Sequence, residues 1–222
     1  MQTEIPKQAL IFDFDGLIVD TESISVNLFE KAFSKVGLTF DIDGFVKLVG
    51  TASGGVYDPW AIYAEHTGKY SPEEVHEYHN RQIDEGVKQA EPLEGVLDLI
   101  DAAKAKGILL AVGSSSPKSW VYPKLEHFGI LDKFDTIVTC DDVADAKPAP
   151  DIFLTVLDRL QVEPENALVL EDSSNGTIAA NRAGIRVVVV PNAITCREDH
   201  SRANYILPSL KHLQLADYFR LN

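Results

Sequence analysis

The chain has 222 residues, of which 45% are hydrophobic and 24% charged, a balance typical of soluble globular proteins and unlike that of disordered ones. Its 34 acidic residues outnumber the 20 basic ones and give a net charge of −14, which disfavours binding to nucleic acid or to anionic membrane surfaces. An anionic metabolite would need a local cluster of cations. The length suits one core domain that carries a smaller insertion.

The two cysteines, Cys140 and Cys196, form no C-x-x-C pattern, so we expect two buried thiols rather than a disulfide framework or a zinc site. The first residues, Met-Gln-Thr-Glu-Ile-Pro-Lys, contain no basic stretch before an apolar run. No segment approaches about 18 uninterrupted apolar residues. We therefore expect a cytoplasmic monomer that binds neither nucleic acid nor membrane.

The first predicted strand, Ala9–Phe12, is followed by two aspartates, Asp13 and Asp15. Because side chains in an extended chain repeat every second residue, both carboxylates leave the strand on the same side. Gly16 then allows the backbone to turn sharply. Two crowded carboxylates favour a bound cation or a shared proton. An ordinary buried strand followed by a solvated acidic turn explains this segment equally well.

The next part of the chain contains helical patterns and no convincing strand, which predicts a small all-helical insertion. The expected helices are Glu22–Val36, Ile42–Val49, Pro59–Thr67 and Pro72–Lys88. The insertion joins the rest of the chain near Asp20 and Pro92. We therefore predict a cap domain over residues 21–89 and a core domain over residues 1–20 and 90–222.

After the insertion, buried strands alternate with helices, which predicts an α/β core with a Rossmann-like, doubly wound parallel sheet. The expected strands are Ile108–Val112, Thr136–Val138, Ala167–Leu170 and Val187–Val190. The expected helices are Gly95–Lys106, Pro117–Phe128, Pro150–Leu160 and Asn175–Ala183.

Polar residues follow three of these strands, and each also has a plain structural explanation. Ser114 could bind an anion beside a helix start, whereas Ser116 is better explained as a helix N-cap. Lys147 is held in a proline-flanked turn, although most lysines are merely solvated. Glu171 and Asp172 could be an acidic first helical turn.

The plain explanations would have to coincide at several strand ends, and this favours a common site at one edge of the sheet. Magnesium prefers oxygen ligands and keeps several waters, so Asp13, Asp172, Glu171 and a backbone carbonyl of Asp15 could coordinate Mg²⁺. Lys147 and the metal would supply the positive charge that an anionic substrate requires.

In their order, and over essentially the whole chain, these residues resemble the four motifs of the haloacid dehalogenase (HAD) superfamily. Asp13-Phe-Asp-Gly with Asp20 resembles the first motif, and Ser114, Lys147 and Glu171-Asp172 resemble the other three. The insertion resembles the C1 cap of the subgroup that contains β-phosphoglucomutases and small-metabolite phosphatases.

The resemblance implies that Asp13 attacks phosphorus to form an aspartyl phosphate and that Asp15 acts as acid and then base. It implies phosphate binding by Asp13, Gly16, Ser114, Ser115 and Lys147. Asp15 argues against dehalogenation, because family dehalogenases lack the second aspartate and the metal. The cofactor would be Mg²⁺, and the partner a small phosphorylated metabolite such as a sugar or polyol phosphate.

Two departures from the family pattern favour a phosphatase over a phosphosugar mutase. Ser25 stands where β-phosphoglucomutases have a proton-shuttling histidine, and Ser53 stands where they have a phosphate-clamping arginine. The loop with Gly50, Thr51, Ala52 and Ser53 would then select the substrate. A mutase and a non-catalytic phosphometabolite sensor stay open as alternatives.

Several other residues receive no functional role from the sequence. His76 and His79 are three residues apart on an expected helix, but no further ligand set supports a metal site, so we predict a solvated helix. Tyr57, Trp60 and Trp120 could line the cap interface, but aromatic side chains more often fill cores. We assign them no role.

Overall fold

A parallel sheet of six strands lies at the centre of the computed structural model, which describes residues 7–50 and 57–219. Its strand order is β3-β2-β1-β4-β5-β6, and every strand pair is parallel. The strands are β1 (Ala9–Phe12), β2 (Leu109–Gly113), β3 (Thr136–Val138), β4 (Ala167–Glu171), β5 (Arg186–Val189) and β6 (Tyr205–Ile206). The Rossmann-like α/β prediction is confirmed, and all five expected strands form within one residue of their predicted bounds. The short edge strand β6 was not predicted.

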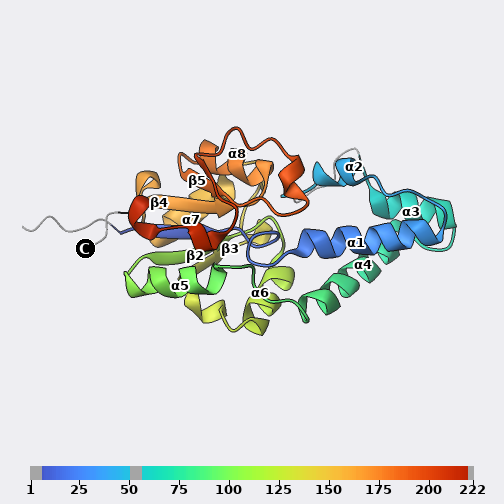
Figure 1. Cartoon of the computed structure of the whole chain (residues 1–222), viewed down its shortest axis with the longest axis horizontal. Coiled ribbons are helices and arrows are strands. Elements are labelled where there is room, and N and C mark those ends of the chain that lie inside the picture. Colours follow the sequence, from blue (N-terminus) through green and yellow to red (C-terminus); the bar gives the residue numbers. More distant parts are fainter. Residues whose placement is uncertain (1–6, 51–56, 220–222) are drawn as a thin grey trace, which may run out of the picture.

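Helices cover both faces of the sheet (Figure 1). Helices α5 (Val96–Ala105) and α6 (Lys118–His127) pack on one face, against the side chains of Leu10 and Phe12. On the opposite face, α7 (Asp151–Leu160) and α8 (Ser174–Arg182) pack against Ala9 and Ile11. The four residues of β1 thus alternate between two cores, which explains why the strand is apolar on both sides.

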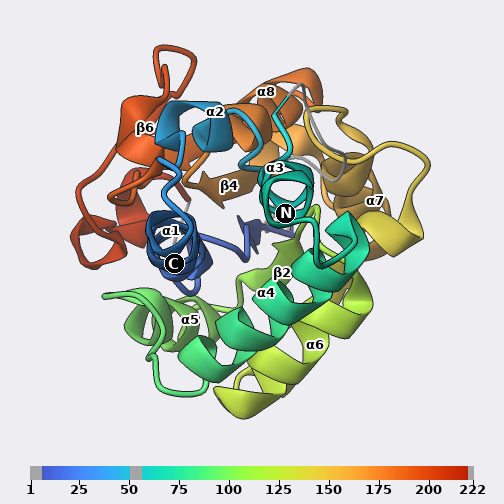
Figure 2. The same cartoon turned by 90° about the vertical axis from the view of Figure 1, so that its right-hand side faces the viewer.

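Over the described residues of the predicted insertion, 21–50 and 57–89, the chain forms four helices. They extend from one end of the sheet (Figure 1) and lie in front of it in the end-on view of Figure 2. They are α1 (Thr21–Lys35), α2 (Ile42–Val46), α3 (Pro59–Thr67) and α4 (Pro72–Val87). We call them the cap helices. The division of the chain into a core (1–20 and 90–222) and a cap (21–89) stays a prediction.

The cap helices have their own apolar cluster and well-formed N-termini. Phe29 stacks on Phe40 with ring centroids 5.1 Å apart, within a cluster of aromatic side chains. The Asp20 side chain accepts a hydrogen bond from the Ser23 amide and so caps α1 where the chain leaves the core. At the start of α4, Ser71 and Glu74 form a reciprocal capping box.

The expectation of two buried cysteines is wrong, although both thiols are free as expected. Cys140 is half-buried and Cys196 is exposed. Cys140 begins the short 3-10 turn Cys140–Asp142, and Cys196 lies within the 3-10 turn Thr195–Arg197. Both turns lie outside the strands whose side chains fill the cores. Over residues 7–50 and 57–219, no helix has the length and apolar character needed to cross a bilayer.

Candidate functional site

The carboxyl ends of β1, β2 and β4 lie side by side, because β1 pairs with both of the others. Phe12, the last residue of β1, pairs with Val112 on one side and with Leu170 on the other. The residues that follow these three positions therefore emerge at the same edge of the sheet. Parallel-sheet proteins commonly bind ligands at this edge.

Lys147 forms a buried ion cluster with two carboxylates at this edge. Its ammonium group donates to Glu171 at 2.6 Å and also to Asp13. The Lys147 side chain is 1% exposed and that of Glu171 is 0% exposed. Burial alone disfavours the ammonium charge, but attraction to Asp13 and Glu171 outweighs it and holds the pKa of Lys147 above its ordinary value. Lys147 therefore stays charged at neutral pH.

Three acidic side chains in the site have a geometry that fits a divalent cation. Asp13, Glu171 and Asp172 each offer a ligand atom within 4.8 Å of the others. One oxygen of Asp172, Oδ1, is buried without a hydrogen-bond partner among the described residues, while Asn192 donates to the other at 2.8 Å. An orphaned carboxylate oxygen next to two further carboxylates is the donor set that Mg²⁺ prefers. Asp13, Glu171 and Asp172, which were predicted to bind the metal, thus have an arrangement that could hold Mg²⁺.

The electrostatics of these carboxylates would favour a bound cation. Burial, followed by repulsion from Glu171, raises the pKa of Asp13 to about 8 despite the opposing effect of Lys147. Burial and repulsion from Glu22 raise the pKa of Asp172 well above its usual range. A bound divalent cation would offset these unfavourable charges and keep the carboxylates ionised. The predicted backbone ligand from Asp15 stays a prediction.

Gly16 provides room for this cluster where the chain turns after β1. It has a φ of +78°, and a side chain at this position would collide with the carboxylates of Asp172 and Glu22. Its amide donates to the carbonyl of Val19 at 2.8 Å. The close approach explains why glycine is needed here, whereas its part in phosphate binding stays a prediction.

Asp15 is held by three hydrogen-bond donors. Its carboxylate accepts from Thr21 Oγ1 at 2.9 Å, from Ser116 Oγ at 2.6 Å and from Trp120 Nε1 at 2.8 Å. The prediction that Ser116 is a helix N-cap is wrong, because α6 begins at Lys118 and the Ser116 hydroxyl turns to Asp15 instead. Trp120 was assigned no role, since a single aromatic residue early in a helix carries no signal of an aspartate partner.

Ser114 and Ser115 lie in the loop after β2, as predicted. Ser114 is 1% exposed, and its hydroxyl oxygen accepts from the amide of Ser116 at 3.0 Å. Ser115 donates to the carbonyl of Gly50 at 3.0 Å and so joins the core loop to the loop between α2 and α3. Thr51, Ala52 and Ser53 of the predicted substrate loop lie outside the described residues.

A cavity of about 520 Å³ connects the carboxylates with the cap helices. Asp13, Asp15 and Ser114 line its core side, while Ser25, His79 and other residues of α1, α3 and α4 line the opposite side. We call this cavity the cleft. Glu22 also lines the cleft, is 7% exposed, and has its pKa raised by burial and by repulsion from Asp15.

His79 is buried against α1, so the prediction of a solvated helix is wrong at this residue, although His76 is exposed. Its Nε2 lies 2.8 Å from the hydroxyl oxygen of Ser25, and its ring stacks on Phe29 with centroids 3.9 Å apart. Burial, followed by repulsion from His76, lowers the pKa of His79 to about 4. The imidazole is therefore neutral at pH 7.

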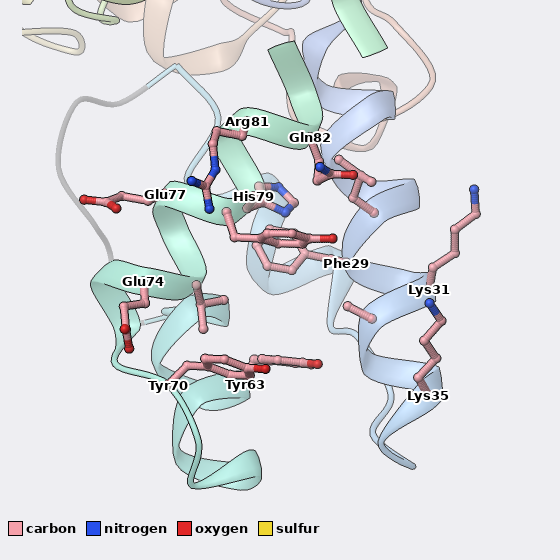
Figure 3. Close-up of a pocket in the computed structure, with 14 residues that line it drawn as sticks. Phe29, Lys31, Lys35, Tyr63, Tyr70, Glu74, Glu77, His79, Arg81 and Gln82 are labelled. Carbon is pink, nitrogen blue, oxygen red and sulfur yellow. The ribbon is translucent and has the colours of Figure 1, made fainter. Parts of the chain in front are cut away.

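A larger cavity, of about 700 Å³, lies on the other side of this histidine, between α1 and α4 (Figure 3). Its wall includes Phe29, Tyr63 and Tyr70. His79 lines both cavities, so the stacked rings of His79 and Phe29 separate them. Because none of the predicted site residues lines the larger cavity, the chemistry belongs to the cleft.

Comparison with known proteins agrees with this geometry. The family model described as "Haloacid dehalogenase-like hydrolase" matches residues 10–190. The chain is 32% identical to the phosphorylated carbohydrates phosphatase of Thermotoga maritima over 180 residues, with 80% of this chain and 82% of that protein covered. It is 35% identical over 210 residues to YhcW of Bacillus subtilis, with 94% of each chain covered.

Solved structures with similar folds extend this comparison. A mutant of CbbY from Rhodobacter sphaeroides in complex with xylulose 1,5-bisphosphate is 30% identical, with a TM-score of 0.77 over 98% of this chain and 100% of that one. β-Phosphoglucomutase from Clostridium difficile is 28% identical, with a TM-score of 0.74 over 95% of each chain. The similarity therefore covers both the strand-end residues and the cap helices.

Proposed function

The chain belongs to the haloacid dehalogenase-like hydrolase family, and we propose that it is a Mg²⁺-dependent phosphatase that hydrolyses a small phosphorylated metabolite through an aspartyl phosphate. The observation that carries the proposal is the contact of Lys147 with both Asp13 and Glu171, beside the orphaned oxygen of Asp172. This arrangement supports Asp13 as the nucleophile and Lys147 as a fixed cation, beside carboxylates that could bind a metal. The phosphatase relatives support hydrolysis of phosphoric monoesters.

In the proposed reaction, a carboxylate oxygen of Asp13 attacks the substrate phosphorus, and the bond from phosphorus to the leaving oxygen breaks. Asp15 gives its proton to that oxygen. Water then attacks the phosphorus of the aspartyl phosphate, Asp15 takes a proton from the water, and Asp13 is released together with inorganic phosphate. The donors from Thr21, Ser116 and Trp120 fix the Asp15 carboxylate for both steps.

The other site residues would bind and orient the phosphoryl group. Lys147 would offset its negative charge, and Ser114 and Ser115, in the loop after β2, would bind its oxygens. Asp13, Glu171 and Asp172 would hold Mg²⁺, which when bound supplies further charge neutralisation at the phosphoryl oxygens. We propose a sugar or polyol phosphate as substrate, and the bisphosphate bound by the CbbY relative widens the candidates. We also propose that the protein is a cytoplasmic monomer. Light scattering would test the monomeric state.

Phosphate release from a panel of phosphomonoesters, measured with Mg²⁺ and with a chelator, tests the proposal. Asp13→Asn should abolish release and leave the fold intact, whereas Asp101→Asn, at an exposed position in α5, should not affect it. Isomerised sugar phosphate without free phosphate would establish a mutase instead. Full activity of Asp13→Asn would reject Asp13 as the nucleophile, and binding without turnover in the wild type would favour a sensor.

A further inference from the structure

The cap side of the cleft presents polar side chains, without lysine or arginine among the described residues, to a bound substrate. The described cap residues with polar side chains that line it are Thr21, Glu22, Ser25, Trp60, His76, His79 and Asn80. Glu22 is the acidic residue in this set, and no lysine or arginine belongs to the lining among residues 7–50 and 57–219. The remaining loop residues, 51–56, read Thr-Ala-Ser-Gly-Gly-Val and also lack a basic side chain.

Basic residues near the cleft form ion pairs or line other cavities; Arg81, next to Asn80 on α4, lines the larger cavity. Lys118 pairs with Asp142 at 2.9 Å, and Lys124 pairs with Asp84 at 2.6 Å. Lys47 lines a different cavity, which it shares with Arg197. Among the described residues, the cation at the reacting end of the cleft is therefore Lys147, which contacts Asp13.

A second phosphoryl group on the substrate would meet unfavourable electrostatics on the cap side. It would carry about −2 charges at neutral pH, and proteins bind such groups with arginine or lysine. Here it would approach Glu22 and the neutral imidazole of His79. Desolvation of the second phosphoryl group would thus be uncompensated by a cation.

Sugar hydroxyls fit the same wall, because each of them can both donate and accept a hydrogen bond. Ser25 and His79 form one pair of polar groups at 2.8 Å, and Asn80 and His76 form another at 3.1 Å. The indole N–H of Trp60 is buried and has no hydrogen-bond partner within the described part of the chain. These groups supply donors and acceptors without a net positive charge.

We propose that the cleft selects phosphomonoesters that have a single phosphoryl group and an uncharged, hydroxyl-bearing remainder, and that it discriminates against bisphosphates. This selectivity rests on the proposed phosphatase function and specifies the class of substrate on which that function acts. It assigns Ser25, His79 and Asn80 to substrate specificity. It also excludes bisphosphates as preferred substrates of this protein.

Binding to the Mg²⁺-loaded Asp13→Asn protein tests the selection without requiring turnover. Calorimetry at pH 8, where exposed histidine is neutral, would compare three matched pairs: glucose 6-phosphate and 1,6-bisphosphate, fructose 6-phosphate and 1,6-bisphosphate, and ribulose 5-phosphate and 1,5-bisphosphate. We expect the monophosphate of a pair to bind about tenfold more tightly. Equal or tighter binding of a bisphosphate, or no binding of any of the six, overturns the selection.

A charge added to the cap side gives an independent test. Asn80→Lys should strengthen bisphosphate binding by about tenfold. It should therefore reduce the ratio of monophosphate affinity to bisphosphate affinity within each pair. Asn27→Lys adds the same charge at an exposed position of α1 and should leave the ratio unchanged. If both variants give the wild-type ratio, the cap wall does not set the selection. If only the selectivity is wrong, these binding tests fail but the wild-type protein still releases phosphate from monoesters. If the hydrolase proposal is wrong, the wild-type protein releases phosphate from none of them.

Discussion

The ammonium nitrogen of Lys147 lies 2.6 Å from a carboxylate oxygen of Glu171, and both side chains are almost completely removed from solvent. The same ammonium group donates to Asp13, so one buried cation serves two buried carboxylates. Breaking such a cluster by removing the cation leaves uncompensated buried charge.

Lys147→Met should therefore destabilise the metal-free protein by about 3 to 5 kcal/mol and abolish phosphate release, because it leaves Asp13 and Glu171 without their partner. Urea unfolding in the presence of a chelator would measure the change in the free energy of unfolding. Lys88→Met removes the exposed ion pair of Lys88 with Glu85 and should cost much less. Equal costs for the two variants would show that Lys147 does not stabilise the buried cluster.

Magnesium should stabilise the folded protein, because the carboxylates at the site are assembled only in the native state. At a concentration about 100 times its dissociation constant, the ion should raise the free energy of unfolding by about 2.7 kcal/mol. Asp172→Asn replaces the side chain with the orphaned oxygen and should remove most of that increase. Asp101→Asn, at an exposed position in α5, should retain it. An unchanged increase in Asp172→Asn would exclude Asp172 as a ligand.

Gly16→Ala and Gly37→Ala form a matched pair that separates backbone strain from crowding at the site. The two glycines have φ values of +78° and +77°, so both alanines should cost about 1 to 2 kcal/mol of stability from strain. A side chain at Gly37 meets no atom within 4 Å, whereas one at Gly16 collides with the Asp172 carboxylate. Only Gly16→Ala should then weaken Mg²⁺ binding and lower activity. Titration of Mg²⁺ against both proteins would check this, and equal affinities would contradict the predicted crowding.

The sheet and its strand-end residues could be predicted because short-range signals determine them. Apolar runs on both faces of β1 and β4 indicate buried parallel strands, and the order of parallel strands brings Asp13 and Glu171 to one edge. The sequence also indicates the cap helices, since α1 and α4 have clear starts at Asp20 and Ser71.

The contacts that the sequence did not predict depend on packing between distant elements. Trp120 reaches Asp15 from α6, across 105 positions of the chain, and no local pattern specifies that partner. His79 occurs in a largely polar helix, and its burial depends on Phe29 and Ser25 of α1 lying beside it. Ser116 precedes a helix and resembles an N-cap, but its hydroxyl donates instead to Asp15, which follows the neighbouring strand β1. Helix and strand patterns do not specify such pairings.

His79→Gln should change how stability depends on pH. The folded-state pKa of about 4 lies below the usual 6.5, so the unfolded chain takes up a proton first, and stability is lost as the pH falls from about 6.5 towards 4. For His79 alone, this loss is about 2 kcal/mol between pH 7 and pH 5. Glutamine can still hydrogen-bond to Ser25 but does not titrate, so the variant should lack this loss.

Urea unfolding at pH 7 and pH 5 would give the change in the free energy of unfolding for the wild type and for His79→Gln. The effect of His79 is the difference between these two changes. That difference is needed because the raised pKa values of Asp13, Glu22 and Asp172 act in the opposite direction, stabilising the fold as the pH falls. Their contribution is common to both proteins and cancels. His127→Gln, at an exposed position, should keep the wild-type dependence. If His79→Gln loses as much stability as the wild type between the two pH values, the imidazole is not held neutral between α1 and α4.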